Sequence, residues 1–345
     1  MTLQTLADRL GVSRTTASNA FNRPDQLNPA LRERVLALAA ELGYAGPDPA
    51  GRALRSGRAG AIGVMFTEGL SYAFADPAAV ATLGGLAAEA ERAATSLVLL
   101  PASFSDTGGP SADAVRAAIV DAFFIISLPE EHPSVLAALE RNVPVVIADT
   151  PRVDGVPFVG IDDRGGARSA AAHLAELGHE QIGVIAFRLR AEGHEGMVDA
   201  RRRRQASYRV TRERLEGYAE GLAADWDDVP LYESYPNSRE AGARAARALL
   251  ALDPRPTALL TMSDELALGA LDAARELELE VPGELSVVGY DDVPAAAAAA
   301  LTTVRQPLVE KGRAAGRMLL EALNGGTPID VELPTELVVR GSTAE

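Results

Sequence analysis

Hydrophobic residues near the start of the chain recur at the spacing of amphipathic helices. Three runs of this kind span residues 3–10, 14–21 and 29–42. Thr2, Ser13 and Asn28 precede these runs, and their side chains are suited to capping a helix N-terminus. Gly11 ends the first run with the permissive backbone that a tight turn needs. Two short helices around a Gly-x-Ser turn, braced by a third helix, predict a helix-turn-helix.

From Ala61 onward the pattern changes to short apolar runs that alternate with helical ones. The apolar runs are residues 61–66, 96–103, 121–128, 143–149, 181–187, 257–262 and 285–291. Apolar strands that alternate with helices predict parallel sheets covered by helices on both faces. The number of units is sufficient for two such sheets, and therefore for two lobes. Ligands of open α/β sheets bind beyond the carboxyl ends of the strands, which predicts a cleft between the lobes.

Composition and charge narrow the class of protein. The chain has 345 residues and no cysteine, which excludes disulfides and thiolate catalysis. Its apolar runs are too short for a membrane span, and its first residues do not resemble a signal peptide, so we expect a cytoplasmic protein. The net charge of −15 is unevenly distributed, with +3 in residues 1–58 and −18 in the remainder. A small basic head on an acidic body is suited to approaching phosphates.

The second predicted helix carries side chains that are suited to reading DNA. Arginine makes bidentate contacts with guanine and asparagine with adenine, and the N-terminal part of such a helix lies at base edges in the major groove. The candidate DNA-binding residues here are Ser13, Arg14, Thr15, Thr16, Ser18, Asn19 and Asn22. Alternatively, the same polar face is simply solvated. In the Pro- and Gly-rich segment 47–59, Arg52 and Leu54 suit a short helix that inserts a leucine into the minor groove, or the segment is a flexible tether.

These segments together resemble the LacI/GalR family of transcription regulators. The matching blocks are TLADRLGVSRTTASNAFN and PAGRALRSG in the head and hinge, and DDRGGARSAAAHLAELGHEQIGVIA, RPTALLTMSDELALGALDAA, VPGELSVVGYDDVP and LTTVRQP downstream. The resemblance implies an all-α helix-turn-helix head followed by an α/β, two-lobed, periplasmic-binding-protein-like body. It implies a DNA-binding domain over 1–46, a hinge over 47–59 and an effector domain over 60–345. Within that domain it places residues of about 60–160 and 294–322 in the first lobe, and about 161–292 and 323–345 in the second, joined by three crossovers.

Strand ends supply the candidates for effector binding. The residues that follow predicted strands are Tyr72, Phe74, Asp149, Phe187, Ser263 and Asp291. The family resemblance adds Arg214, in the segment RLEGY, and again points to Asp291. A carboxylate accepts hydrogen bonds from two sugar hydroxyls, and a guanidinium donates two parallel hydrogen bonds to a pair of neighbouring oxygens. The alternatives are that Tyr72 and Phe74 belong to a core or an interface, and that Asp162, Asp163 and Asp264 only cap helices.

The leading hypothesis is a homodimeric repressor of carbohydrate-related genes that binds a palindromic operator and is controlled by a sugar or sugar derivative. No cofactor, metal or membrane partner is expected. The arginine run 201–204 suggests an anionic effector or nucleic acid, or a solvated helix face, and the role of the segment 188–213 is open. A solute-binding protein of a transporter shares the body but requires an export signal. An enzyme is disfavoured because the four histidines stand in no catalytic or metal-binding spacing, and His173 and His179 suit a helix end.

Overall fold

The computed structural model describes residues 2–46, 57–102, 108–222 and 226–345. Its contacts divide the chain into two units, residues 1–60 and 61–345. The first unit is helical and the second has parallel sheets flanked by helices, so the predicted fold class is confirmed. Among the described helices, none is both long enough and apolar enough to cross a membrane. The hinge candidates Arg52 and Leu54 lie outside the described residues.

The first unit is a three-helix cluster whose ends are set by capping residues. Its helices are α1 (Leu3–Leu10), α2 (Arg14–Asn22) and α3 (Pro29–Glu41), with the short η1 (Pro24–Gln26) between the last two. Ser13 Oγ accepts a hydrogen bond from Thr16 N at 3.0 Å, which caps α2. Gly11 adopts the left-handed conformation, with φ of 64°, and ends α1. A small core of buried residues from all three helices holds them together: Leu3, Leu6, Ala7, Ala17, Ala20, Val35 and Ala39.

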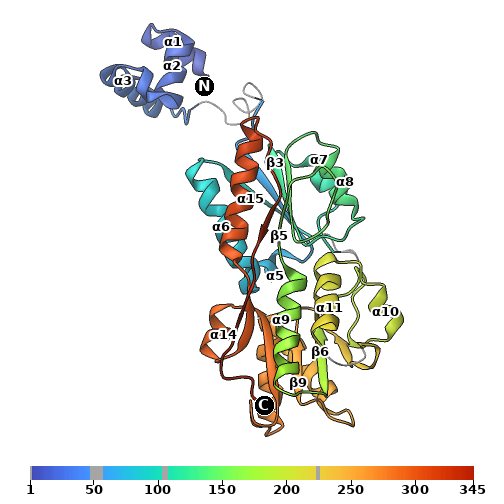
Figure 1. The fold of residues 1–345 in the computed structure, drawn as a ribbon. Coiled ribbons are helices and arrows are strands. Elements are labelled where there is room, and N and C mark those ends of the chain that lie inside the picture. Colours follow the sequence, from blue (N-terminus) through green and yellow to red (C-terminus); the bar gives the residue numbers. More distant parts are fainter. Residues whose placement is uncertain (1, 47–56, 103–107, 223–225) are drawn as a thin grey trace. The chain divides into compact units, whose positions relative to one another are not determined.

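The first lobe of the second unit contains a six-stranded sheet in the order β12-β5-β4-β3-β1-β2, and all its strand pairs are parallel. The strands are β1 (Ala61–Phe66), β2 (Ser96–Leu100), β3 (Ala122–Ile126), β4 (Val145–Ala148), β5 (Phe158–Ile161) and β12 (Val331–Leu333). The helices are α5 (Leu70–Ala75), α6 (Pro77–Arg92), α7 (Ala112–Ala117), α8 (Pro133–Leu139) and α15 (Leu308–Leu323). Helices α6 and α15 cover one face and α7 and α8 the other (Figure 1).

The second lobe contains a seven-stranded sheet in the order β13-β11-β10-β9-β6-β8-β7, in which only the edge strands β7 and β13 run antiparallel. The strands are β6 (Ile182–Ala186), β7 (Gly196–Met197), β8 (Leu231–Glu233), β9 (Ala258–Thr261), β10 (Ser286–Asp291), β11 (Thr302–Arg305) and β13 (Glu336–Val338). The helices are α9 (Asp163–Glu176), α10 (Ala200–Arg204), α11 (Arg209–Gly221), α12 (Arg239–Leu250), α13 (Asp264–Glu276) and α14 (Pro294–Ala298), with η2 (Trp226–Asp228). The pairs α9/α11 and α12/α13 bury separate cores on opposite faces.

Strand pairing corrects the predicted lobe boundaries. Strand β11 pairs with β10, so the segment 294–305 belongs to the second lobe and not to the first. Strand β12 pairs with β5, so the chain stays in the first lobe beyond residue 322. The predicted lobe boundaries near residues 294 and 323 were wrong, because the sequence pattern of a three- or four-residue strand does not show which sheet it joins. Its pairing with a strand far away in the sequence decides this. The chain passes between the lobes after β5, after β11 and after β12, which gives three crossovers.

Helices α6 and α15 approach each other so closely that only glycine fits at positions 85 and 312. A Cβ atom on Gly312 would stand 1.9 Å from the carbonyl oxygen of Thr82, and one on Gly85 would stand 2.0 Å from that of Val309. This close packing fixes α15 on the sheet of the first lobe. The first turn of α15 carries Lys311, which is buried and contributes to the cavity described below.

Candidate nucleic-acid interface and effector cavity

Helix α2 presents a polar face that is only partly engaged within the head. Ser13, Arg14, Thr15 and Asn22 are exposed, while Thr16, Ser18 and Asn19 are half-buried. Positions 15, 18, 19 and 22 share one helix face by their spacing of three and four residues. Asn22 Nδ2 donates to Ser18 Oγ at 3.1 Å, and Ser13 Oγ lies 2.8 Å from Thr16 Oγ1. These bonds hold the polar side chains in place, and Arg14 and Thr15 extend outward at the N-terminal end of the helix.

A cavity of about 210 Å³ lies between the two lobes, at the carboxyl ends of the strands of both sheets. Six of the seven predicted effector residues line it: Tyr72, Asp149, Phe187, Arg214, Ser263 and Asp291. Phe74 is the exception, because its side chain is 62% exposed on α5 and is absent from the cavity wall. Tyr72 and Phe74 are two residues apart on one helix, so they point in different directions. The effector assignment of Phe74 is therefore corrected.

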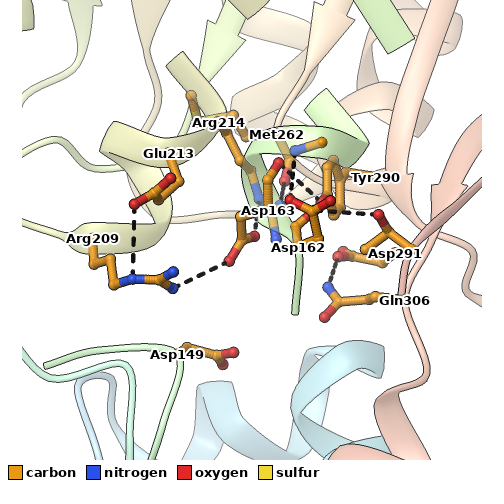
Figure 2. A network of polar contacts seen from close by, with 12 residues as sticks. Asp149, Asp162, Asp163, Arg209, Glu213, Arg214, Met262, Tyr290, Asp291 and Gln306 are labelled. Atoms are coloured by element: carbon orange, nitrogen blue, oxygen red, sulfur yellow. Dashed lines mark hydrogen bonds and ion pairs between the residues drawn. The ribbon is translucent and has the colours of Figure 1, made fainter. Parts of the chain in front are cut away.

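Arg214 is held in the cavity wall by groups of the second lobe. Its Nε donates to Asp163 Oδ1 at 2.9 Å, its Nη1 donates to the carbonyl oxygen of Met262 at 2.5 Å, and its guanidinium lies 3.5 Å from the centre of the Tyr290 ring (Figure 2). Burial is the largest single influence on Arg214 and opposes its charge, but Asp163, Tyr290 and Asp291 together raise the pKa of the guanidinium above its usual value. Arg214 therefore remains a cation whose charge is paired within the protein.

Asp291 ends β10 and belongs to a chain of polar contacts that reaches into the first lobe. Gln306 Nε2 donates to Asp291 Oδ1 at 2.5 Å, and Lys311 Nζ donates to Gln306 Oε1 at 3.1 Å and to Asp149 Oδ1 at 2.9 Å. Burial, reinforced by nearby Asp264, raises the pKa of Asp291 well above its usual range. The carboxyl group of Asp291 therefore holds its proton more firmly than that of an exposed aspartate.

Further contacts join the two lobes directly at the cavity, and sequence reasoning had not found them. Arg188, just after β6, forms an ion pair with Glu68, which follows β1. The strand-end rule that identified Asp149 would also have found both residues. Asn237 Nδ2 donates to Tyr72 Oη at 3.1 Å and brings in the loop that follows β8. That loop was missed because β8 has only three residues and its pattern predicts no strand.

Two buried hydroxyl groups in the cavity wall have no hydrogen-bond partner among the described residues. They are Thr150 Oγ1, on the first lobe, and Tyr208 Oη, on the second. Thr150 is 1% exposed and Tyr208 is 6% exposed, so water from the bulk does not satisfy them readily. Burial raises the pKa of Tyr208 to about 12, so its hydroxyl keeps its proton and can both donate and accept. Such groups are costly unless a ligand or ordered water pairs with them.

Several of the alternatives considered for polar residues are resolved by the contacts. Asp162 Oδ1 accepts from Gly165 N at 2.7 Å, so this carboxylate caps α9. In the arginine run, Arg202 pairs with buried Glu233, and Arg203 donates to backbone carbonyls, including that of Val229 at 2.7 Å. Arg202 thus holds its segment to β8 and Arg203 holds it to the residues just before that strand, so half of the run is engaged within the protein. The described residues contain no cluster of three or more side chains that could hold a metal ion.

The helix-turn-helix unit places the chain in the class of DNA-binding proteins, and the two-lobed body adds a cavity at its strand ends, where ligands of α/β sheets bind. Residues 2–46 match the model of bacterial regulatory proteins of the lacI family, and residues 171–343 match that of the periplasmic binding protein-like domain. The chain belongs to the lacI family of transcription regulators.

Relatives and solved structures agree with this assignment. The HTH-type transcriptional regulator Rv3575c of Mycobacterium tuberculosis is 44% identical over 347 residues, which cover 99% of this chain and 96% of the relative. The lac repressor dimer bound to operator and the anti-inducer ONPF has a TM-score of 0.77 at 26% identity, with 100% of this chain and 99% of that one covered. A complex of the transcriptional regulator CelR with cellobiose has a TM-score of 0.67 at 28% identity, with 99% of each chain covered. This protein is therefore a DNA-binding transcription regulator.

Proposed function

We propose that this regulator is a repressor of carbohydrate-related genes, which binds a palindromic operator as a homodimer in the cytoplasm and is controlled by a sugar or sugar derivative in the inter-lobe cavity. The observation that carries the proposal is the cavity itself, because polar side chains from the strand ends of both lobes converge on it. A binding function, and not a catalytic one, fits a chain whose relatives are regulators.

The operator part of the proposal rests on α2. Its exposed Arg14 and Thr15 stand at the N-terminal end of the helix, which is the part that meets base edges in a helix-turn-helix. A two-fold symmetric dimer presents two such helices and therefore matches an inverted repeat. The lac repressor structure, described as a dimer bound to operator, supports this arrangement by analogy.

The sugar part of the proposal rests on the chemistry of the cavity wall. Carboxylates, amides and hydroxyls supply acceptors and donors, while Phe66 and Phe187 supply apolar surface. Sugars present both kinds of surface, and binding sites commonly combine an apolar wall with a few well-placed polar groups. The complex of CelR with cellobiose shows a sugar bound to a protein of the same fold.

Contacts between the lobes suggest how a ligand would control DNA binding. Glu68 pairs with Arg188, Tyr72 accepts from Asn237, and Arg212 lies 2.7 Å from Glu130 at the rim. A ligand that touches both lobes changes the balance between open and closed arrangements by its differential affinity for the two. Coupling of this kind is typically worth ~1–3 kcal/mol, which is a change of about 5- to 150-fold in operator affinity.

Binding of the full-length protein to DNA tests the proposal. The purified protein is mixed with fragments of the genome that encodes it, and bound fragments are selected, sequenced and footprinted at a stated salt concentration, because phosphate contacts make affinity salt-dependent. We expect protection of a short inverted repeat, and release when one member of a panel of sugars is added. Binding without sequence preference would refute the operator assignment. A specific complex that no sugar affects, but another small molecule releases, would refute the sugar assignment alone.

A further inference from the structure

Each cation in the wall of the effector cavity already has a carboxylate partner. Arg188 pairs with Glu68, Arg214 Nε lies 2.9 Å from Asp163 Oδ1, and Lys311 Nζ lies 2.9 Å from Asp149 Oδ1. Among the described residues of the wall the cations are Arg188, Arg214 and Lys311, and all three are buried. The positive charge of the site is therefore neutralised by the protein itself.

Two more carboxylates line the cavity without a cation of their own. Asp291 accepts from the Gln306 amide, and Asp76 Oδ2 accepts from Ala79 N at 3.3 Å at the start of α6. Burial raises the pKa of both acids. A further negative charge in this cavity would have to displace a carboxylate from one of the buried ion pairs, because Asp291 and Asp76 offer it no cation. Such a displacement is unfavourable where water is excluded.

The unpaired hydroxyl groups of the wall are neutral. Tyr208 and Thr150 line the cavity from opposite lobes, and Tyr208 Oη and Thr150 Oγ1 are buried and lack a partner among the described residues. The Tyr208 ring lies 5.5 Å from the Arg188 guanidinium, which keeps the phenol in position. A hydroxyl both donates and accepts, so it complements another hydroxyl better than it complements a charged group that already needs a counter-ion.

We propose that the cavity selects an uncharged polyhydroxylated effector, contacted by the hydroxyls of Tyr208 and Thr150, and excludes phosphorylated and acidic sugars. This inference rests on the proposed function, because it takes the cavity as the effector site. None of the four arginines in the run 201–204 lines the cavity, so the run supplies no positive charge that would bind an anionic effector there.

The first experiment measures charge exclusion with inorganic phosphate as the probe. Thermal unfolding of the full-length protein is followed with a few millimolar phosphate, and with sodium chloride at the same ionic strength. In the variant Glu68→Gln, Arg188 loses its carboxylate, and in Asp149→Asn, Lys311 loses its partner. We expect phosphate to raise the Tm of both variants by several degrees more than that of the wild type. In the double variant Glu68→Gln/Arg188→Gln we expect phosphate to raise the Tm no more than in the wild type. That result would assign the phosphate-dependent rise in Tm to the cavity and not to the head.

Two outcomes would overturn the charge argument. One is a wild-type protein that phosphate stabilises, with the effect abolished by Arg188→Gln, because the cation would then be available already. The other is a pair of variants that respond no more than the wild type, because pairing would then not be what excludes anions. In the sugar screen, release of the operator by a phosphorylated or acidic sugar at lower concentration than by its neutral parent would also reject the proposal.

The second experiment asks whether the Tyr208 hydroxyl is kept for a ligand. The variant Tyr208→Phe removes a hydroxyl that the described residues leave unpaired, so we expect the Tm without ligand to stay the same or to rise. The matched control is Tyr218→Phe, because Tyr218 Oη donates to the carbonyl oxygen of Thr261 at 3.1 Å and its loss should lower the Tm. Equal losses of Tm in the two variants would contradict the assignment. Both experiments omit DNA, so their failure is distinct from a failure to bind an operator.

Discussion

Arg214 and Asp163 form a buried ion pair that joins α11 to α9 beside the cavity, with only 4% and 2% of the two residues exposed. Replacing Arg214 by alanine leaves the carboxylate of Asp163 without this partner in a site that excludes water. We expect the free energy of unfolding to fall by ~3–5 kcal/mol. Chemical denaturation measures this change. The control is Arg164→Ala on the exposed side of α9, where the solvent-screened ion pairs with Glu216 and Glu220 should add little to the free energy of unfolding. Equal losses would mean that the buried pair contributes no more than the exposed ones.

Asp291 should be needed for the response to effector but not for DNA binding. Its side chain lines the cavity, far along the chain from the head. In the variant Asp291→Ala, we expect the operator complex to form with unchanged affinity and to resist a sugar that releases the wild-type protein. A gel-shift titration with and without that sugar measures both properties. A normal response in this variant would remove Asp291 from the effector site.

Arg14 and Asn19 should determine base preference. Alanine at either position removes the side chain that could pair with a base edge, so we expect discrimination at one operator position to fall by ~1–3 kcal/mol. Competition between operators that carry single base changes measures this loss. Thermal stabilisation of the body by effector should stay as in the wild type, and this serves as the control. Two variants with wild-type selectivity would place the base contacts elsewhere.

Gly312 should not tolerate a methyl group, because a Cβ there would overlap the carbonyl oxygen of Thr82. In Gly312→Ala we expect α15 to shift, and the free energy of unfolding to fall by ~1–3 kcal/mol. Gly84 is a matched control on the partner helix α6, since a Cβ at that site meets no atom within 4 Å. Gly84→Ala should stabilise the protein by ~0.5–1 kcal/mol through its higher helix propensity. Similar effects of the two substitutions would argue against the close contact of the helices.

Asp264 should make the stability of the body depend on pH. Burial raises its pKa from 3.8 to about 7, although Thr303 Oγ1 and Val293 N donate to it. Between these two values the folded state holds a proton that the unfolded state has lost, so the contribution of Asp264 to stability falls as pH rises. The slope is at most ~1.4 kcal/mol per pH unit. Denaturation from pH 4 to pH 8 should show a flatter curve for Asp264→Asn than for the wild type. A curve of the same slope would mean that Asp264 is ionised throughout.

Much of the fold follows from local patterns, because each capping residue and each long apolar run acts over its own neighbourhood. Ser13 and Gly11 set the ends of helices in the head, and the strand before Asp291 is apolar along its length. The ends of such strands lead directly to Asp149 and Asp291 in the cavity. Local patterns are weakest for very short strands, whose identity depends on a distant partner. Strand β12 is an example, since it is recognised only through its pairing with β5.

The residues of the cavity that the sequence did not predict were missed for the same reason, because their positions depend on distant contacts. Asn237 follows β8, a strand too short for its pattern to predict, and Tyr208 stands at the start of α11 in a segment with no clear period. Lys311 is the only lysine of the sequence, but nothing in its neighbourhood predicts that α15 would bring it to Asp149. Phe74 shows the opposite error. It lies close to a strand end in the sequence, but the turn of α5 directs its side chain to the surface.

The chain returns to the first lobe through α15 and β12, and this determines when that lobe can fold during synthesis. The sheet of that lobe lacks an edge strand and a covering helix until residue 333 has been synthesised, although its first strand begins at residue 61. The helical head needs only the first few tens of residues, whereas the first lobe must wait for almost the whole chain to leave the ribosome. During this interval its incomplete apolar surface is open to chaperones and to other nascent chains. Loss of residues 308–333 should therefore damage the lobe that is begun first.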